Sequence, residues 1–148
     1  MTDTLTRQER SERMSRIRGK GSASEMRLRR LIHSMGYRYR LHVRTLPGTP
    51  DLVFPSRKAV IFMHGCFWHR HQGCHLARMP KSRVAFWTEK LETNKRRDET
   101  NTRRLKELGW RVLVIWECQM KAKDLNEVSN VVRRFLADGT GGDHDEIG

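Results

Sequence analysis

Two short apolar runs limit the possible folds of this chain more than any other feature of its sequence. Residues 59–63 read AVIFM and residues 111–116 read RVLVIW, so both are nearly free of polar side chains. Turn-forming residues precede each run, Pro55 to Lys58 before the first and Gly109 before the second. Runs of this length, rich in β-branched and aromatic residues, are typical of buried strands. We therefore expect a sheet with these two strands in the protein interior.

Other periodicities predict the elements around these strands. Ser22 and Glu25 form a capping-box pattern at the start of an apolar stripe with helical spacing, and Gly36 ends this helix. Residues 37–43 alternate strictly, as in a half-buried strand, with one face made of Tyr37, Tyr39, Leu41 and Val43. Residues 51–54 suit a short strand, 82–108 a long charged helix and 128–135 a closing amphipathic helix. This order predicts an α/β fold with one mixed central sheet flanked by helices.

The net charge indicates a polyanionic partner. Thirty Lys and Arg residues against 17 Asp and Glu give a formal charge of +13. The length of 148 residues is typical of one domain. Nucleic acid is the first candidate, and charge alone leaves both DNA and RNA open. We expect residues 1–20 to form a basic arm, residues 21–137 the folded domain and residues 138–148 an acidic tail.

The composition disfavours three classes of protein. No apolar run approaches the ~20 residues that cross a bilayer, which excludes an integral membrane protein. The N-terminal residues lack the apolar stretch of a signal peptide. Three Cys residues, an odd number, do not suggest a disulfide framework. We therefore expect a cytoplasmic location.

A loop between the two apolar runs, residues 65–80, is crowded with possible metal ligands. Together with one residue just past the last strand it offers Cys66, His69, His71, Cys74, His75 and Cys118. Thiolates are the most diagnostic ligands of a structural zinc site, which needs four ligands in all. The predicted set is Cys66, His71, Cys74 and Cys118. The alternative is three reduced thiols beside surface histidines.

A second group of residues could carry phosphodiester chemistry. Asp51 follows Pro50 at the start of a strand, a suitable place for a divalent cation, although an Asx turn or an ion pair would also explain it. Only half of the nuclease motif PD…(D/E)xK is present, because residues 62–64 read FMH. His64 and His69 could accept a proton from water, or could be core residues or zinc ligands. Glu25 could complete this cluster or simply cap its helix.

Adjacent aromatic residues form a third group. Phe67 and Trp68 lie in the polar loop, and Phe86 and Trp87 lie in the long charged helix. In a basic protein, exposed aromatic rings can stack on bases or wedge between them. Core packing is an equal alternative for Phe86 and Trp87.

Several of these segments together resemble one known family. Residues 60–69 (VIFMHGCFWH), 109–118 (GWRVLVIWEC), 46–51 (LPGTPD) and 10–17 (RSERMSRI) are similar to the very short patch repair (Vsr) DNA mismatch endonucleases. The resemblance extends from about residue 6 to residue 120. It implies a restriction-endonuclease-like fold with a structural zinc, acting as a monomer on duplex DNA. The family recognises T·G mismatches, which arise from deamination of 5-methylcytosine, and nicks the strand 5′ to the mispaired thymine with Mg²⁺.

The resemblance also implies residue roles. Asp51 and the backbone carbonyl of Met63 would hold Mg²⁺, His69 would activate water, Glu25 would support His69, and His64 stands where other nucleases of this fold carry Lys. The zinc ligands would be Cys66, His71, Cys74 and Cys118. The residues that enter the duplex would be Phe67, Trp68 and Trp87, and the arm that clamps its backbone would use Arg13, Arg16, Arg18 and Lys20.

The resemblance further implies a bacterial, nucleoid-associated protein whose partners include mismatch-repair proteins and a cytosine methyltransferase system. Three other functions remain open from the sequence. These are a different nuclease of the same fold, a zinc-stabilised DNA-binding module without catalysis, and an RNA-binding protein.

Overall fold

The structure is a computed structural model that describes residues 23–137. The basic arm and the acidic tail, and with them Ser22, Arg13, Arg16, Arg18 and Lys20, lie outside the described residues. The helices are α2 (Ala23–Ser34), α3 (Val84–Glu107), α4 (Glu117–Met120) and α5 (Asn126–Ala137). The strands are β1 (Arg40–Leu41), β2 (Leu52–Phe54), β3 (Ala59–His64) and β4 (Arg111–Trp116), and short 3-10 helices span Pro55–Arg57 and His75–Ala77.

The strands form one mixed sheet in the order β1-β2-β3-β4. The pairs β1–β2 and β2–β3 are antiparallel, and β3–β4 is parallel, with Ala59 opposite Arg111 and His64 opposite Trp116. A parallel pair needs a long crossover, which residues 65–110 provide through the Cys/His-rich loop and α3. The predicted mixed sheet flanked by helices is therefore confirmed.

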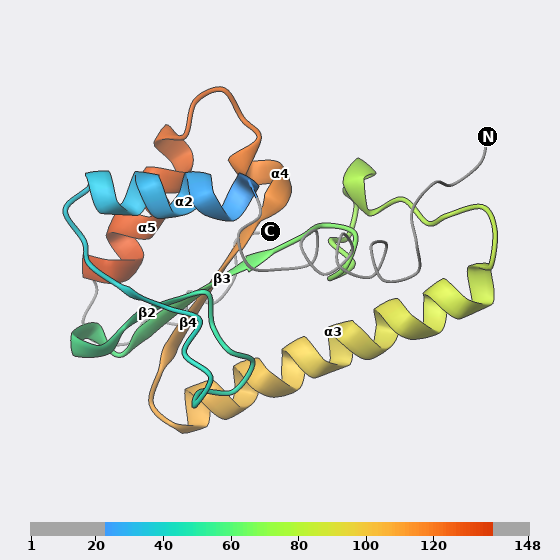
Figure 1. The fold of residues 1–148 in the computed structure, drawn as a ribbon, viewed down its shortest axis with the longest axis horizontal. Coiled ribbons are helices and arrows are strands. Elements are labelled where there is room, and N and C mark those ends of the chain that lie inside the picture. The colour runs from blue at the N-terminus through green and yellow to red at the C-terminus, as the bar shows by residue number, and fades with distance from the viewer. Residues whose placement is uncertain (1–22, 138–148) are drawn as a thin grey trace, which may run out of the picture.

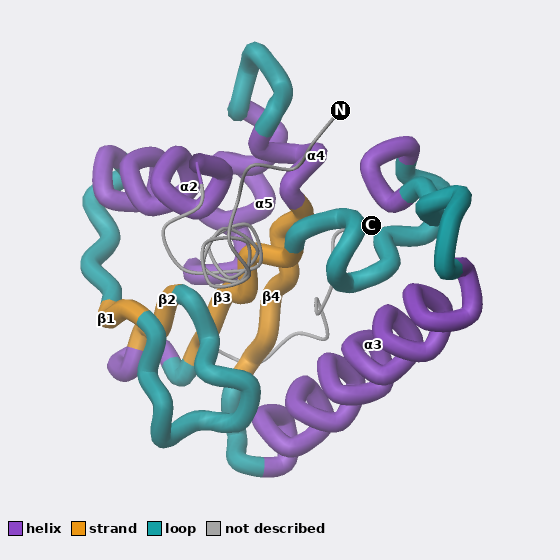
Figure 2. Tube along the Cα trace, turned by 45° about the vertical axis from the view of Figure 1, so that its right-hand side comes forward, coloured by secondary structure: helices purple, strands orange, loops and turns teal. Residues whose placement is uncertain are grey.

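Helices cover both faces of this sheet, which explains the two wholly apolar runs. Side chains of a strand alternate between its faces. Ile61 and Leu113 point into a core formed with α2, α4 and α5, whereas Val60 and Val112 point into a second core that includes Leu105 of α3. Figures 1 and 2 show α2 and α5 on one face and α3 on the other. Strands buried on both faces carry apolar side chains at successive positions and do not alternate between apolar and polar residues.

The predicted strand at residues 37–43 is largely wrong, because only Arg40 and Leu41 pair with β2. His42 has a left-handed backbone (φ 46°), which interrupts an extended strand. The four apolar side chains of this segment also do not share one buried face. Tyr37 and Tyr39 pack against the core under α2, Val43 packs against the other core, and Leu41 is 41% exposed.

Helix α3 is a long polar helix with few buried residues. Only Leu91, Asn94 and Leu105 are buried among its 24 residues. The helix ends where predicted, since Gly109 follows it with a φ of 91°. Most of its charged side chains are exposed. No helix formed by residues 23–137 has the length and hydropathy of a membrane span.

Candidate active site and metal centre

The predicted catalytic residues gather where β2 begins and β3 ends. Because these strands are antiparallel, the residue before β2 lies beside the carboxyl end of β3. Asp51 Oδ2 accepts a hydrogen bond of 2.7 Å from the backbone N–H of Met63. The side chain of Asp51 is thus held beside the Met63 backbone, and Asp51 and Met63 are the pair expected to hold Mg²⁺.

Asp51 shares this corner with Glu25 from α2 and with His42. His42 Nε2 lies 2.9 Å from Glu25 Oε2 and 3.5 Å from Asp51 Oδ1, and one oxygen or nitrogen from each of the three side chains lies within 4.8 Å of the others. Glu25 also pairs with Arg29 one turn along α2. Burial raises the pKa of Asp51 to about 7, and the neighbouring Glu25 adds to the rise while the Met63 hydrogen bond opposes it. Such a corner favours a bound cation, which would neutralise the two carboxylates.

A second cluster, formed by His64, His69 and Asp98, lies on the opposite side of β3's end. The His64 and His69 rings stack, with centroids 3.9 Å apart and planes 3° from parallel. Asp98 from α3 contacts His69 Nδ1 through Oδ2. This contact orients the ring and leaves Nε2 as the atom that can accept a proton.

His64 is 7% exposed, and burial lowers its pKa well below the usual value, with the His69 charge as a second cause. Its imidazole is therefore neutral near pH 7. In this structure it does not supply the positive charge that a Lys at this position would supply.

The two clusters face one cleft of about 390 Å³. Its lining includes Asp51, Met63, His64, His69 and Asp98, together with Gly48 and Asn101. Gly48 has a φ of +77°, and a Cβ there would lie 3.1 Å from the Asn101 side chain. The turn before β2 can approach α3 this closely because residue 48 is a glycine. A carboxylate that suits a cation and an oriented imidazole on opposite sides of one cleft form an arrangement suited to hydrolysis.

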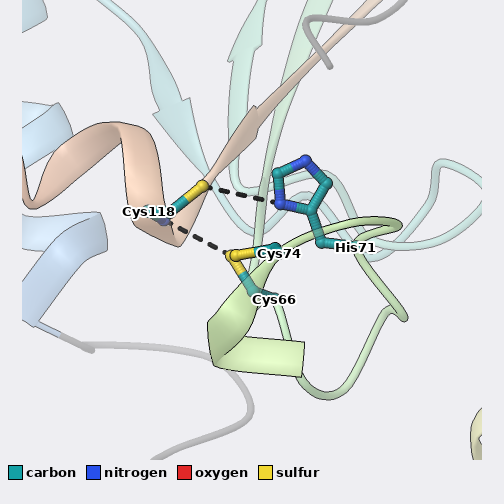
Figure 3. A group of neighbouring side chains, drawn as sticks. All are labelled: Cys66, His71, Cys74 and Cys118. Carbon is teal, nitrogen blue, oxygen red and sulfur yellow. Dashed lines mark hydrogen bonds between the residues drawn. The ribbon is translucent and has the colours of Figure 1, made fainter. Parts of the chain in front are cut away.

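The four predicted zinc ligands converge at the carboxyl ends of β3 and β4, as Figure 3 shows. One donor atom from each of Cys66, His71, Cys74 and Cys118 lies within 4.8 Å of the others. The backbone N–H of Cys118 lies 3.4 Å from Cys66 Sγ, and Cys118 Sγ lies 3.5 Å from His71 Nδ1. The His71 ring also stacks on Trp116, with centroids 4.1 Å apart. His75 is exposed and is not part of this group.

Burial raises the pKa of the Cys66 thiol to about 12 and also raises the pKa of Cys118. Burial lowers the pKa of His71, which favours its neutral, ligating form. Three thiols and one imidazole within tetrahedral reach of a common point fit a structural zinc site. The metal would have to displace the thiol protons, so binding would be coupled to their release.

The aromatic residues expected to enter DNA form one cluster of edge-to-face contacts. Phe67, Trp68 and Trp87 lie with ring centroids 5.0 to 5.9 Å apart. Phe67 and Trp87 are partly exposed, whereas Trp68 is 5% exposed and its carbonyl accepts a hydrogen bond from Asn94. Phe86, for which core packing was an equal alternative, is 45% exposed.

Two site residues were missed by the sequence analysis, and one expected contact is formed by a different residue. Asp98, not Glu25, supplies the carboxylate that contacts His69, and Glu25 instead contacts His42 and Arg29. Asp98 is one acidic residue in a charged helix, so no local pattern marks it. His42 appeared to belong to a regular strand, and only its position beside Asp51 reveals it.

Comparison with known sequences indicates the family of this chain. A family model described as DNA mismatch endonuclease Vsr matches residues 2–76. Type II nicking enzyme V.XorIIP from Xanthomonas oryzae pv. oryzae is 46% identical over 136 residues, which cover 92% of this chain and 98% of that protein. DNA mismatch endonuclease Vsr from Escherichia coli is 42% identical over 124 residues, covering 84% of this chain and 79% of that protein.

A solved structure supports the fold. The catalytic domain of the homing endonuclease I-Bth0305I superposes with a TM-score of 0.56 at 16% identity, covering 82% of this chain and all of that domain. This agrees with the expected restriction-endonuclease-like fold. The family model spans half of the chain and the relatives span most of it, so the chain belongs to the DNA mismatch endonuclease Vsr family.

Proposed function

We propose that this endonuclease recognises T·G mismatches in duplex DNA and nicks the strand 5′ to the mispaired thymine by metal-dependent hydrolysis. The observation that carries the proposal is the cleft in which Asp51 and the Met63 backbone face His69 and its partner Asp98. Relatives over most of the chain are named as a mismatch endonuclease and as a nicking enzyme.

Asp51 and the Met63 backbone carbonyl would hold Mg²⁺ in this cleft. A bound Mg²⁺ would offset the charge that develops on the phosphate under attack. His69 Nε2 would accept the proton of the attacking water, while Asp98 holds the ring at Nδ1 and stabilises the imidazolium that forms. The stacked His64 ring would limit the motion of His69. Glu25, through its contact with His42, would hold the side chains around Asp51 in place for the cation.

The Cys66, His71, Cys74 and Cys118 cluster would bind a structural Zn²⁺. His69 lies in the loop between Cys66 and His71. A metal that joins this loop to Cys118, just beyond β4, would therefore fix the position of His69. The zinc site would support catalysis without contacting the substrate.

Mismatch selection would depend on how easily the DNA deforms. A wobble pair stacks less well than a Watson–Crick pair, so inserting Phe67 and Trp87 beside it costs less than inserting them elsewhere. Trp68 would have to leave its buried position to take part. The arm residues Arg13, Arg16, Arg18 and Lys20 would add salt-dependent backbone affinity. We also propose a cytoplasmic monomer that cooperates with mismatch-repair proteins and a cytosine methyltransferase system.

A strand-nicking assay tests the function directly. Two labelled duplexes would be identical except for T·G or C·G at one position in a cytosine-methylation context, and each would be incubated with and without Mg²⁺. We expect Mg²⁺-dependent nicking 5′ to the thymine of the T·G duplex alone. Asp51→Ala should retain mismatch binding and lose cleavage.

Equal cleavage of both duplexes would instead indicate a different nuclease of this fold. Tight T·G binding without any cleavage would indicate a zinc-stabilised DNA-binding module. Stronger binding of RNA than of mismatched DNA would contradict the proposal altogether.

A further inference from the structure

The cleft continues past the two stacked histidines into a larger groove, which we call the α3 groove. It has a volume of about 720 Å³ and shares His64, His69, Asp98 and Thr102 with the cleft. One wall is α3, the other is the loop at Arg70 to Gln72, and the floor is Val114 and Trp116 of β4. The phosphate under attack would lie between Asp51 and His69, and this space is therefore open on the side of β3 away from Asp51.

The lining of the α3 groove contains more cationic than anionic side chains. Arg70, Lys95, Arg103 and Lys106 line it, against the carboxylates of Asp98 and Glu99. Asp98 already pairs with His69, and Arg70 lies 3.8 Å from Glu92 outside the groove. Lys95, Arg103 and Lys106 are exposed. Positions 95, 99, 102, 103 and 106 recur at helical spacing and share one face of α3.

The length of this face suits a polymer more than a small ligand. Residues 95 to 106 span about three helical turns, or about 16 Å. One strand of a duplex carries a phosphate about every 3.4 Å along its axis. Cations spread over such a length can meet several successive phosphates, whereas one small anion would reach only one or two of them.

The distribution of cations distinguishes the cleft from the groove. Among Lys and Arg residues only Arg44 lines the cleft around Asp51. On the other side of His69 the α3 groove presents Lys95 and Arg103 to further phosphates of the strand. We infer that the α3 groove binds the sugar–phosphate backbone of the cleaved strand on one side of the scissile phosphate, through Lys95 and Arg103. This inference rests on the proposed function, because it places the scissile phosphate at His69.

Binding of DNA at several salt concentrations tests the inference without cleavage. Fluorescence anisotropy in Mg²⁺-free buffer would compare the wild type with the double variant Lys95→Gln/Arg103→Gln. Each lost phosphate contact reduces the magnitude of the negative slope of log affinity against log salt by about 0.9, which is about fivefold in affinity at 0.15 M salt. For the double variant we expect a slope smaller in magnitude by about 2 and a loss of affinity of roughly 30-fold. Glu99→Gln, which removes the opposing charge, should strengthen binding.

The matched control is Arg133→Gln/Arg134→Gln, which removes the same charge from exposed positions on α5, across the sheet. Duplexes with single uncharged methylphosphonate linkages would then locate the contacts. In the wild type, neutral linkages on one side of the cut should weaken binding, and this effect should be absent in the groove variant. Melting curves would confirm that each variant is folded.

Equal slopes for the groove variant and the wild type would overturn the inference, as would an equal loss in the control pair. It would also be overturned if the groove variant kept its sensitivity to every neutral linkage. These failures are separate from failure of the proposed function, which is judged by T·G-specific nicking of the wild type. A wild type that nicks normally beside an unaffected groove variant rejects the groove alone.

Discussion

The raised pKa of Asp51 predicts that the candidate active site destabilises the metal-free protein. A carboxyl with a pKa of about 7 when folded, and 3.8 without these surroundings, holds a proton in the native state that the unfolded chain releases between these values. Stability should therefore fall as pH rises from about 4 to about 7. One pKa unit corresponds to about 1.36 kcal/mol. Ionisation of Asp51 therefore lowers the free energy of unfolding by about 2 kcal/mol at pH 5 and by about 4 kcal/mol at pH 8.

Asp51→Asn should remove this cost, because the amide is neutral at every pH and its oxygen can still accept the Met63 N–H. We expect the variant to be more stable than the wild type by about 2–4 kcal/mol at pH 8 and by less at pH 5. The assay is urea unfolding in Mg²⁺-free buffer that retains zinc. Glu107→Gln, a change of equal charge at an exposed position of α3, is the control and should alter stability little.

Added Mg²⁺ should reduce this difference in stability, since it stabilises only a protein that binds it. The wild type should gain stability with Mg²⁺ and Asp51→Asn should not. The reasoning would be refuted if the variant were no more stable than the wild type at pH 8, or if its advantage did not grow between pH 5 and pH 8.

Three further predictions concern the other parts of the molecule. Asp98→Asn should lower the single-turnover nicking rate about 100-fold or more and change the pH profile of this rate, because the His69 ring loses its orientation. DNA affinity should stay intact, and an unchanged nicking rate would contradict the role of Asp98. Cys118→Ser and zinc removal should both lower the melting temperature, with metal analysis giving one zinc per chain, and an unchanged melting temperature would argue against the ligand set. Leu105→Ala should lower the free energy of unfolding in urea by about 2–5 kcal/mol, because it leaves a cavity between α3 and the sheet. Leu108 is 58% exposed, so Leu108→Ala should lower the free energy of unfolding far less. Equal losses of stability in the two variants would contradict the burial of Leu105.

The zinc centre shows what local composition can predict about a site. Few functions explain so many thiols and imidazoles in one loop, so the choice of Cys66, His71 and Cys74 followed from chemistry and spacing. Cys118 lies just past the last predicted strand, from where it could return to the same place. The structure brings all four together and leaves out His75. The metal itself stays a prediction.

The catalytic cluster shows where local composition was insufficient. Asp51 and His69 stand out because a turn and a specific loop motif flank them, but the partners of each depend on packing. Asp98 reaches His69 only because α3 lies on the same face of the sheet as the loop. A single carboxylate among many on a polar helix carries no mark of its role in the sequence.

The sequence by itself determined the helices that carry an apolar stripe, the buried strands β3 and β4, and the family, whereas the strict alternation of residues 37–43 did not predict the short strand that forms there. A helix or strand that buries one or both faces carries apolar residues at the spacing of that element, so this pattern can be read from residues close in the chain. The pairing of His42 with Glu25, the support of His69 by Asp98 and the course of the α3 groove were decided only by tertiary structure. Each joins side chains from elements distant in sequence, and no local pattern records how a mixed sheet and a long crossover helix bring them together.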